Sequence, residues 1–169
     1  MVPNRAIVTR YGPEEQRRTF LMTNIAPQRP SLNRGPWREM EQRIADLWTD
    51  RYGELWVIAG AISGTDQHSR ETLAGTSVDV PDRYFMLIAA QDADGVRALA
   101  VLLDHHQARS QDFPVHDIVT IEELERATGL EFFPDMPHYL KNALKRDRPT
   151  RLWPIRWFDL PKLIMIRFT

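Results

Sequence analysis

Residues Thr19–Trp48 read TFLMTNIAPQRPSLNRGPWREMEQRIADLW. This stretch contains an apolar segment, a polar loop and an amphipathic segment, in that order. Residues 19–23 are apolar and rich in β-forming side chains, which predicts a strand. Asn24 lies at the exit of this strand, and a polar loop over residues 26–34 follows. The stretch therefore predicts a strand, a tight loop and a helix that begins near Pro36.

The start and the end of this helix are both marked in the sequence. Pro36 suits the first helical position, because proline lacks the N–H that would be unpaired there, and Gly35 becomes the expected N-cap. Apolar side chains then recur every three or four residues, so one face of the helix is expected to be buried. They are Trp37, Met40, Ile44, Leu47 and Trp48. We expect the helix to run to about Arg51 and to end at Gly53.

Two polar residues of this stretch, Asn33 and Glu41, are candidates for a functional site. Glu41 lies at the margin of the apolar helix face, where a carboxylate is costly unless it is paired, hydrogen-bonded or near a cation. Their separation in sequence corresponds to at most about 12 Å along a helix. One direct metal ligand, with one outer residue that holds a metal-bound water, fits this spacing better than two direct ligands.

Structural roles for both residues remain open from spacing alone. Asn33 also suits a turn in which its side chain hydrogen-bonds its own backbone. Glu41 also suits an ion pair with Arg38 or Arg43 on the same helix. Without further information, spacing favours these structural roles over a metal site.

The same residues form a motif that resembles the DNA/RNA non-specific endonuclease family, which includes secreted bacterial nucleases and mitochondrial endonuclease G. The family pattern is a hydrophobic strand, S/T-N-x-x-P-Q, L-N-x-x-x-W and a glutamate four residues after the tryptophan. Each of these elements is present between Phe20 and Glu41. Two later segments, Val80–Phe85 and Ile121–Pro134, resemble the family's next strand and its closing helix, so the resemblance runs to about Pro134.

The resemblance implies an α+β fold of the ββα-metal, or His-Me finger, type, in which helices flank a central antiparallel sheet. It implies that Asn33 binds a single catalytic divalent ion, Mg²⁺ or another such as Mn²⁺. It also implies that Glu41 orients a metal-bound water and that Asn24 supports the active-site loop. The implied activity is endonucleolytic cleavage of DNA and RNA, and the dimers common in the family suggest a homodimer.

Phosphate binding is expected from an arginine of the same stretch, Arg29, Arg34 or Arg38. Contacts with the phosphate backbone carry no base information, so this mode of binding tolerates any sequence and either sugar. The formal net charge is only −1, so a basic surface in this chain must be local.

One family element is missing from the 169 residues. The D-R-G-H motif, whose histidine is the family's general base, occurs nowhere in the chain, and all five histidines lie downstream of Glu41. The opening segment Met1–Gly12 matches what normally follows that histidine. We therefore expect a chain that lacks its N-terminal portion and is severely impaired as a nuclease, and a naturally degenerate relative is the other explanation.

Two rival functions follow from the missing motif. A non-catalytic module that binds nucleic acid or protein predicts metal and DNA binding without cleavage. A purely structural motif predicts that Mg²⁺ neither binds nor stabilises the chain. For the domain organisation we expect a nuclease-like domain over residues 1–136 and an apolar C-terminal extension, residues 137–169, packed on it.

Composition sets outer limits on these functions. A chain of 169 residues with 43% apolar content is long enough for one domain with a hydrophobic core. The absence of cysteine excludes disulfides and thiol chemistry. No apolar run approaches the length of a membrane span, so no membrane partner is expected. No signal-peptide pattern is present at the start, and the compartment stays undecided.

The strands expected after the first helix follow from apolar runs. Residues 55–62 form a continuous apolar run that predicts a central strand. Residues 84–90 and 97–103 flank an Asp-Gly step, which predicts an antiparallel hairpin. We also expect a short strand at residues 78–80 and an extended segment at residues 113–118.

Two helices are expected in the last third of the chain. Thr120 and Glu123 form a capping box that opens a helix, and Gly129 ends it. Residues 138–145 suit a short helix. The pair His105 and His106 suggests a metal site only weakly, because adjacent strand residues point to opposite faces of a sheet.

Overall fold

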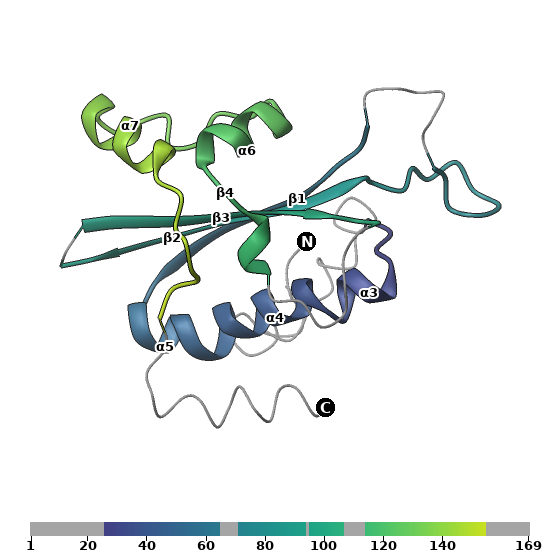
Figure 1. Ribbon diagram of the computed structural model, residues 1–169, viewed down its shortest axis with the longest axis horizontal. Coiled ribbons are helices and arrows are strands. Elements are labelled where there is room, and N and C mark those ends of the chain that lie inside the picture. The colour runs from purple at the N-terminus through teal and green to yellow at the C-terminus, as the bar shows by residue number, and fades with distance from the viewer. Residues whose placement is uncertain (1–25, 65–70, 94, 107–113, 155–169) are drawn as a thin grey trace, which may run out of the picture.

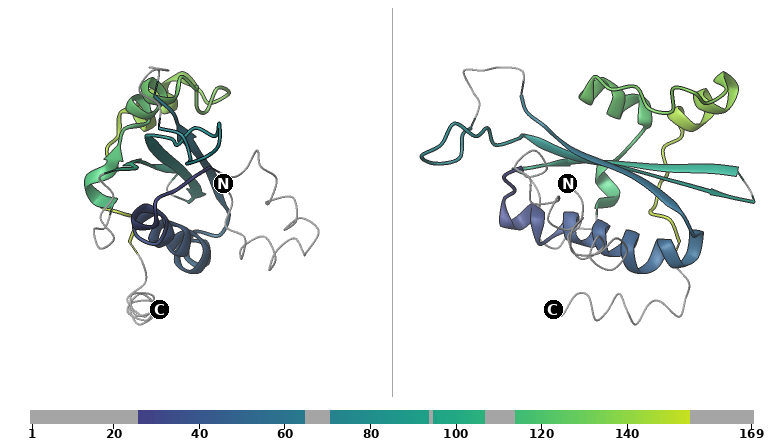
Figure 2. Two further views of the ribbon diagram at one scale, coloured as in Figure 1. Left: turned by 90° about the vertical axis from the view of Figure 1, so that its right-hand side faces the viewer. Right: turned by 180° about the vertical axis from the view of Figure 1, so that it is seen from behind.

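The computed structural model describes residues 26–64, 71–93, 95–106 and 114–154. An antiparallel sheet of four strands lies between two helical layers (Figure 1). One layer is a long helix on one face of the sheet, and the other is a pair of shorter helices on the opposite face (Figure 2). The expected α+β class is confirmed, whereas the strand predicted at residues 19–23 and Asn24 lie outside the described residues.

The long helical layer consists of consecutive segments. α3 covers Pro30–Asn33, α4 covers Pro36–Gln42, a π-helical segment covers Arg43–Trp48, and α5 covers Thr49–Tyr52. Gly35 is the N-cap of α4, as predicted, and Gly53 ends α5 with a φ of 74° that favours glycine.

Two features of this layer differ from the prediction. The polar loop contains the single helical turn α3, because Pro30 at its first position has the φ angle of a helix and no N–H to leave unpaired. The helix after it widens into the π-helical segment, in which the Thr49 N–H bonds the Ile44 carbonyl five residues back.

The four strands follow the chain order in space. β1 covers Leu55–Ile62, β2 covers Arg83–Asp92, β3 covers Gly95–Asp104 and β4 covers Ile118–Val119, and each pairs antiparallel with the next. The predicted β2–β3 hairpin is confirmed, and both of its strands are longer than predicted.

The strand predicted at residues 55–62 is confirmed as β1 with the same bounds. Among the described strands it lies at the edge of the sheet, and Trp56 and Ile58 are 50% and 47% exposed. Its central position stays a prediction, because the other strand predicted ahead of it lies outside the described residues. Two further strand predictions were wrong. Residues 78–80 contain only an isolated bridge between Asp79 and Thr72. Residues 114–117 form a 3-10 turn ahead of β4. An apolar run predicts a strand, but the number of its neighbours depends on distant segments.

Every β2 residue from Tyr84 to Ala90 is buried, because both faces of this strand are covered. Side chains alternate across the sheet, so Tyr84 and Met86 pack with the α4 layer whereas Phe85 and Leu87 pack under α6. Trp153 joins the α4 side of the core, where its carbonyl accepts the Trp48 indole N–H at 3.2 Å.

The second helical layer is formed by α6, Ile121–Thr128, and α7, His138–Arg146. The predicted capping box is confirmed: the Glu123 N–H donates to Thr120 Oγ1 at 3.1 Å, and the Thr120 N–H donates to Glu123 Oε2 at 2.7 Å. Gly129 ends α6 in the left-handed conformation. Across the described ranges, none of the helices has the length and apolar character needed to span a bilayer.

Gly60 in β1 leaves room for the ring of Phe85, its partner in β2. A Cβ at Gly60 would lie 2.7 Å from Cε1 and 2.9 Å from Cζ of that ring. We expect Gly60→Ala to lower the free energy of unfolding by about 1–3 kcal/mol, measured by urea denaturation, because the buried ring must shift. In a Phe85→Leu background, which lacks these ring atoms, the same change should cost less. An equal cost in both backgrounds would contradict the ring clash.

Candidate metal and nucleic-acid site

Asn33 ends α3 with its side chain exposed to solvent. Its Nδ2 donates to Gln28 Oε1 at 2.7 Å, so the amide nitrogen is turned towards Gln28. The Asn33 Oδ1 atom accepts no hydrogen bond from the part of the chain that the structure describes. An amide oxygen held in this way is a ligand that hard divalent cations such as Mg²⁺ accept.

Gln28 was not among the predicted site residues, although it is the last residue of the Pro27-Gln28 element of the motif. Its Oε1 holds Asn33, and its Nε2 is buried without a hydrogen-bond partner among the described residues. Burying an unpaired amide group is unfavourable, so this orientation of the Gln28 side chain has a local cost.

Glu41 lies on α4 one turn after Trp37, and its Oε1 accepts the Trp37 indole N–H at 2.9 Å. Arg43, one of the two partners considered from sequence, pairs instead with Glu39 at 3.3 Å. Burial raises the pKa of Glu41 above its usual value, and this effect is larger than the lowering by the Trp37 hydrogen bond. A nearby cation would favour the ionised carboxylate, so Glu41 fits an outer position around a metal ion.

A cation at this position would have few protein ligands. No group of three or more His, Cys, Asp or Glu side chains with metal-binding geometry occurs within the described ranges. Mg²⁺ commonly keeps several waters and takes one or two protein oxygens. The chain therefore offers a cation one amide oxygen, from Asn33, and one outer carboxylate, from Glu41. This ligand set is compatible with Mg²⁺, but it is too small to surround an ion with protein ligands alone.

The predicted phosphate-binding arginines differ in their surroundings. Arg29 is held by Glu71, with Nη2 at 3.0 Å from Oε2 and 3.2 Å from Oε1. Arg34 is exposed and Arg38 is half-buried, and neither forms an ion pair with the residues described. Arg34 and Arg38 are therefore the cations available to an anionic ligand, whereas Glu71 neutralises Arg29.

Two residues far along the chain anchor the loop that leads to Asn33, and neither was predicted as a site residue. Tyr84 in β2 donates its hydroxyl to the Pro27 carbonyl. His105, just after β3, accepts the Arg29 backbone N–H on Nε2 at 2.6 Å. No local sequence signal identifies these contacts, because both depend on how the sheet packs against the loop.

A family model described as DNA/RNA non-specific endonuclease matches residues 1–138. The chain belongs to the DNA/RNA non-specific endonuclease family. Among individual relatives, mitochondrial nuclease EXOG of Xenopus laevis is 27% identical over 168 residues, which is 93% of this chain and 44% of that protein. Mitochondrial endonuclease G of Bos taurus is 29% identical over 126 residues, 70% of this chain and 42% of that protein.

The fold of this endonuclease-family chain is also that of a solved relative. The crystal structure of the EndoG/EndoGI complex contains a chain that matches with a TM-score of 0.64 and 23% identity, over 76% of this chain and 56% of that chain. The described α+β architecture is thus the family's own. The chain spans less than half the length of the EXOG and endonuclease G relatives it matches.

Proposed function

We propose that this chain carries the metal-binding half of a divalent-cation-dependent endonuclease site that hydrolyses phosphodiester bonds in DNA and RNA. Two observations carry the proposal: Gln28 holds the Asn33 amide with Oδ1 left available, and Glu41 is a half-buried carboxylate on the helix that follows. Family membership supports the nuclease class. The D-R-G-H histidine is not among the 169 residues, so we propose that cleavage by this chain alone is severely impaired.

In the proposed mechanism each residue has one role. Asn33 Oδ1 would hold the cation, Mg²⁺ or Mn²⁺, and Glu41 would accept hydrogen bonds from water near it. When bound, such an ion stabilises charge at the phosphorus and on the leaving oxygen. Arg34 and Arg38 hold the phosphate backbone, which makes the substrate range independent of base sequence.

The first test is Mn²⁺ binding followed by plasmid cleavage with Mg²⁺. Asn33→Ala removes the proposed ligand, and Asn142→Ala, an exposed asparagine on α7, is the matched control. We expect Mn²⁺ affinity to fall at least about tenfold in Asn33→Ala and to stay unchanged in Asn142→Ala. Equal Mn²⁺ affinity in all three proteins would exclude Asn33 as a ligand and would favour a purely structural motif.

A non-catalytic binding module is the second candidate, and the absence of D-R-G-H from the 169 residues favours it. It predicts Asn33-dependent Mn²⁺ binding and DNA binding without cleavage. Cleavage that requires both Mg²⁺ and Asn33 would exclude this candidate and would also refute our proposal that the chain lacks a usable general base. A homodimer is a further proposal, which sedimentation velocity with and without DNA tests directly.

Replacing Arg34 or Arg38 with glutamine is expected to weaken DNA and RNA binding to a similar extent for all sequences. Each change should lower the slope of log affinity against log salt by about 1, because one phosphate contact is lost. Arg29→Gln should have a smaller effect, since Glu71 already neutralises Arg29. Fluorescence anisotropy over a salt series measures these slopes.

The matched control for the arginines is Arg126→Gln. Arg126 is exposed on α6, in the helical layer on the opposite face of the sheet from α4 (Figure 1). Its replacement should leave the salt slope unchanged. A loss equal to that of Arg38→Gln would contradict binding of nucleic acid on the α4 side alone.

A further inference from the structure

His105 is 1% exposed and forms three hydrogen bonds at the end of β3. Its backbone N–H donates to the Asp82 carbonyl at 2.8 Å, and its ring Nδ1 lies 2.7 Å from the Pro81 carbonyl. Its Nε2 accepts the Arg29 backbone N–H at 2.6 Å. A carbonyl can only accept and an amide N–H can only donate, so the ring carries its proton on Nδ1 and is neutral.

The residue bonded by this imidazole also holds Asn33. The Arg29 carbonyl accepts the backbone N–H groups of Leu32 at 3.1 Å and Asn33 at 3.0 Å. Arg29 is the N-cap of α3, and no side chain caps that turn. A turn of four residues has little stability of its own, so its position depends on external anchors such as His105.

Tyr84 is the second anchor of the same loop, since its hydroxyl donates to the Pro27 carbonyl. Gln28, which orients the Asn33 amide, lies between the two anchored residues. The Tyr84 ring contacts His105 edge-on with ring centroids 5.2 Å apart, and it contacts Trp37, the partner of Glu41, at 5.7 Å. His105 and Tyr84 thus connect the sheet to both candidate metal-site residues.

We propose that His105 is a positioning residue of the metal site: its neutral imidazole fixes Arg29, and through it Asn33, and protonation of the ring releases the loop. This inference rests on the proposed function, because it takes Asn33 as the metal ligand. Once it is protonated, the Nε2 atom can no longer accept a hydrogen bond. A proton there would face the Arg29 N–H, and two donors would oppose each other.

The groups around His105 come from each element that packs on it. They are His106 beside it, Arg29 ahead of α3, Glu71 from residues 71–80, and Tyr84 on β2. Burial lowers the pKa of His105 below its usual value of 6.5, and the hydrogen bond to Pro81 opposes this only in part. The ring is therefore neutral near pH 7, and the hydrogen bond to Arg29 is lost as the pH falls through this lowered pKa.

Two replacements at His105 separate its hydrogen bonds from its shape. His105→Phe keeps a ring and removes both ring hydrogen bonds, whereas His105→Gln keeps one donor and one acceptor and cannot titrate. His106→Gln, at an exposed neighbour, is the matched control. Hydrogen–deuterium exchange of residues 28–34 at neutral pH measures the loop, and Mn²⁺ affinity measures the site.

We expect exchange in this segment to accelerate at least about tenfold in His105→Phe, because the Arg29 N–H loses its buried acceptor. Mn²⁺ affinity should fall at least about tenfold in the same variant. His105→Gln and His106→Gln should match the wild type in both measurements. Unchanged exchange and unchanged affinity in His105→Phe would overturn the proposal.

The pH dependence of Mn²⁺ affinity distinguishes a titrating positioning residue from a residue with a purely structural role. Wild-type Mn²⁺ affinity should fall more steeply than that of His105→Gln as the pH falls below 6.5, since burial lowers the pKa of His105 below that value. If His105→Phe does not fold, this comparison decides, and identical profiles would overturn the proposal. If the wild type shows no Asn33-dependent Mn²⁺ binding, the proposed function fails, while the exchange measurement still tests whether His105 positions Asn33.

Discussion

Replacing Glu41 with glutamine is expected to stabilise the metal-free chain near neutral pH and to weaken its Mn²⁺ affinity by about 10- to 100-fold. The variant keeps an oxygen that accepts the Trp37 indole N–H, and it removes a half-buried negative charge. A buried charge lowers the stability of the fold, whereas the same charge favours binding of a cation. Glu41→Gln should therefore raise stability and lower Mn²⁺ affinity.

The pH dependence of this effect follows from the direction of the pKa shift. The pKa of Glu41 is raised above its usual value of 4.5, so the folded state favours the protonated carboxyl. The stability gained from this group is present below about pH 4.5 and is lost as the pH rises through the raised pKa. Wild type and variant should therefore be equally stable in acid, and the variant should be more stable at pH 7.

Thermal unfolding from pH 4 to pH 8 and Mn²⁺ titration at pH 7 measure the two effects. Glu39→Gln is the matched control, since Glu39 lies on the same helix and forms an ion pair with Arg43 at 3.3 Å. This control should lose stability and keep its Mn²⁺ affinity. A Glu41→Gln variant that is less stable than wild type at pH 7 would show that the carboxylate has a favourable partner that offsets its burial.

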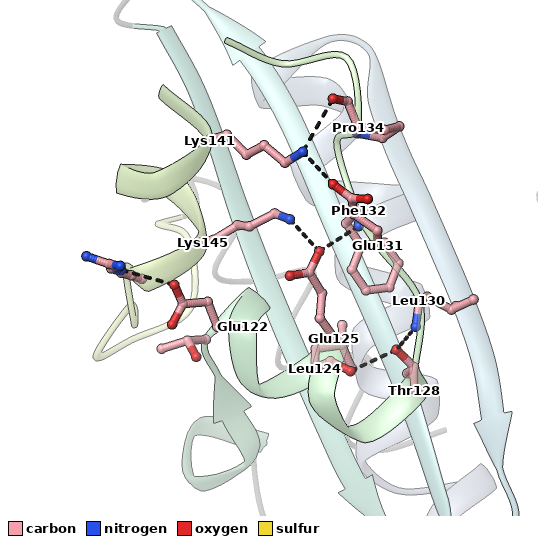
Figure 3. A network of polar contacts seen from close by, with 12 residues as sticks. Glu122, Leu124, Glu125, Thr128, Leu130, Glu131, Phe132, Pro134, Lys141 and Lys145 are labelled. Carbon is pink, nitrogen blue, oxygen red and sulfur yellow. Dashed lines mark hydrogen bonds and ion pairs between the residues drawn. The ribbon is translucent and has the colours of Figure 1, made fainter. Parts of the chain in front are cut away.

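Replacing Glu125 with alanine is expected to lower the free energy of unfolding by about 3 kcal/mol or more. Glu125 Oε1 is the shared acceptor of Lys145 Nζ at 2.5 Å and of the Phe132 N–H at 2.7 Å (Figure 3). The Lys145 side chain is only 9% exposed. Removing the carboxylate would leave a buried ammonium and a backbone N–H without partners, and both are costly.

The same network ties α7 to α6, so the loss should concentrate there. Lys141, one helical turn before Lys145, donates to Glu131 at 2.6 Å and to the Pro134 carbonyl at 3.3 Å (Figure 3). Urea denaturation measures the global loss, and hydrogen exchange along α7, His138–Arg146, measures the local one.

An exposed ion pair on the same two helices provides the control for Glu125. Glu122 pairs with Arg146 at 3.0 Å, and these side chains are 44% and 73% exposed. Glu122→Ala should cost less than about 1 kcal/mol, because solvent screens such pairs. The double variant Glu125→Leu with Lys145→Met should recover the part of the loss that comes from the unpaired ammonium, whereas the Phe132 N–H stays without an acceptor. Equal losses for Glu122→Ala and Glu125→Ala would show that burial does not decide the strength of these pairs.

The sequence determined the elements whose causes are local. Pro36 after Gly35 and the capping box of Thr120 and Glu123 each act over a few residues, and the structure has both, together with the β2–β3 hairpin that the Asp-Gly step predicted. Apolar periodicity also predicted the buried face of the long helix. Such signals can be recognised in the sequence because capping and side-chain spacing depend on neighbours within about one helical turn or one pair of strands.

The motif predicted Asn33 and Glu41 as site residues, but only the tertiary structure decided which side chains surround them. The pairing of β1 with β2, the anchors that His105 and Tyr84 provide for the loop, and the burial of Lys145 against Glu125 all join segments far apart in the chain. His105 and Arg29 are 76 residues apart. Such contacts arise when a sheet and a helix pack against each other, and no local pattern encodes them, since the same side chains are equally compatible with solvent.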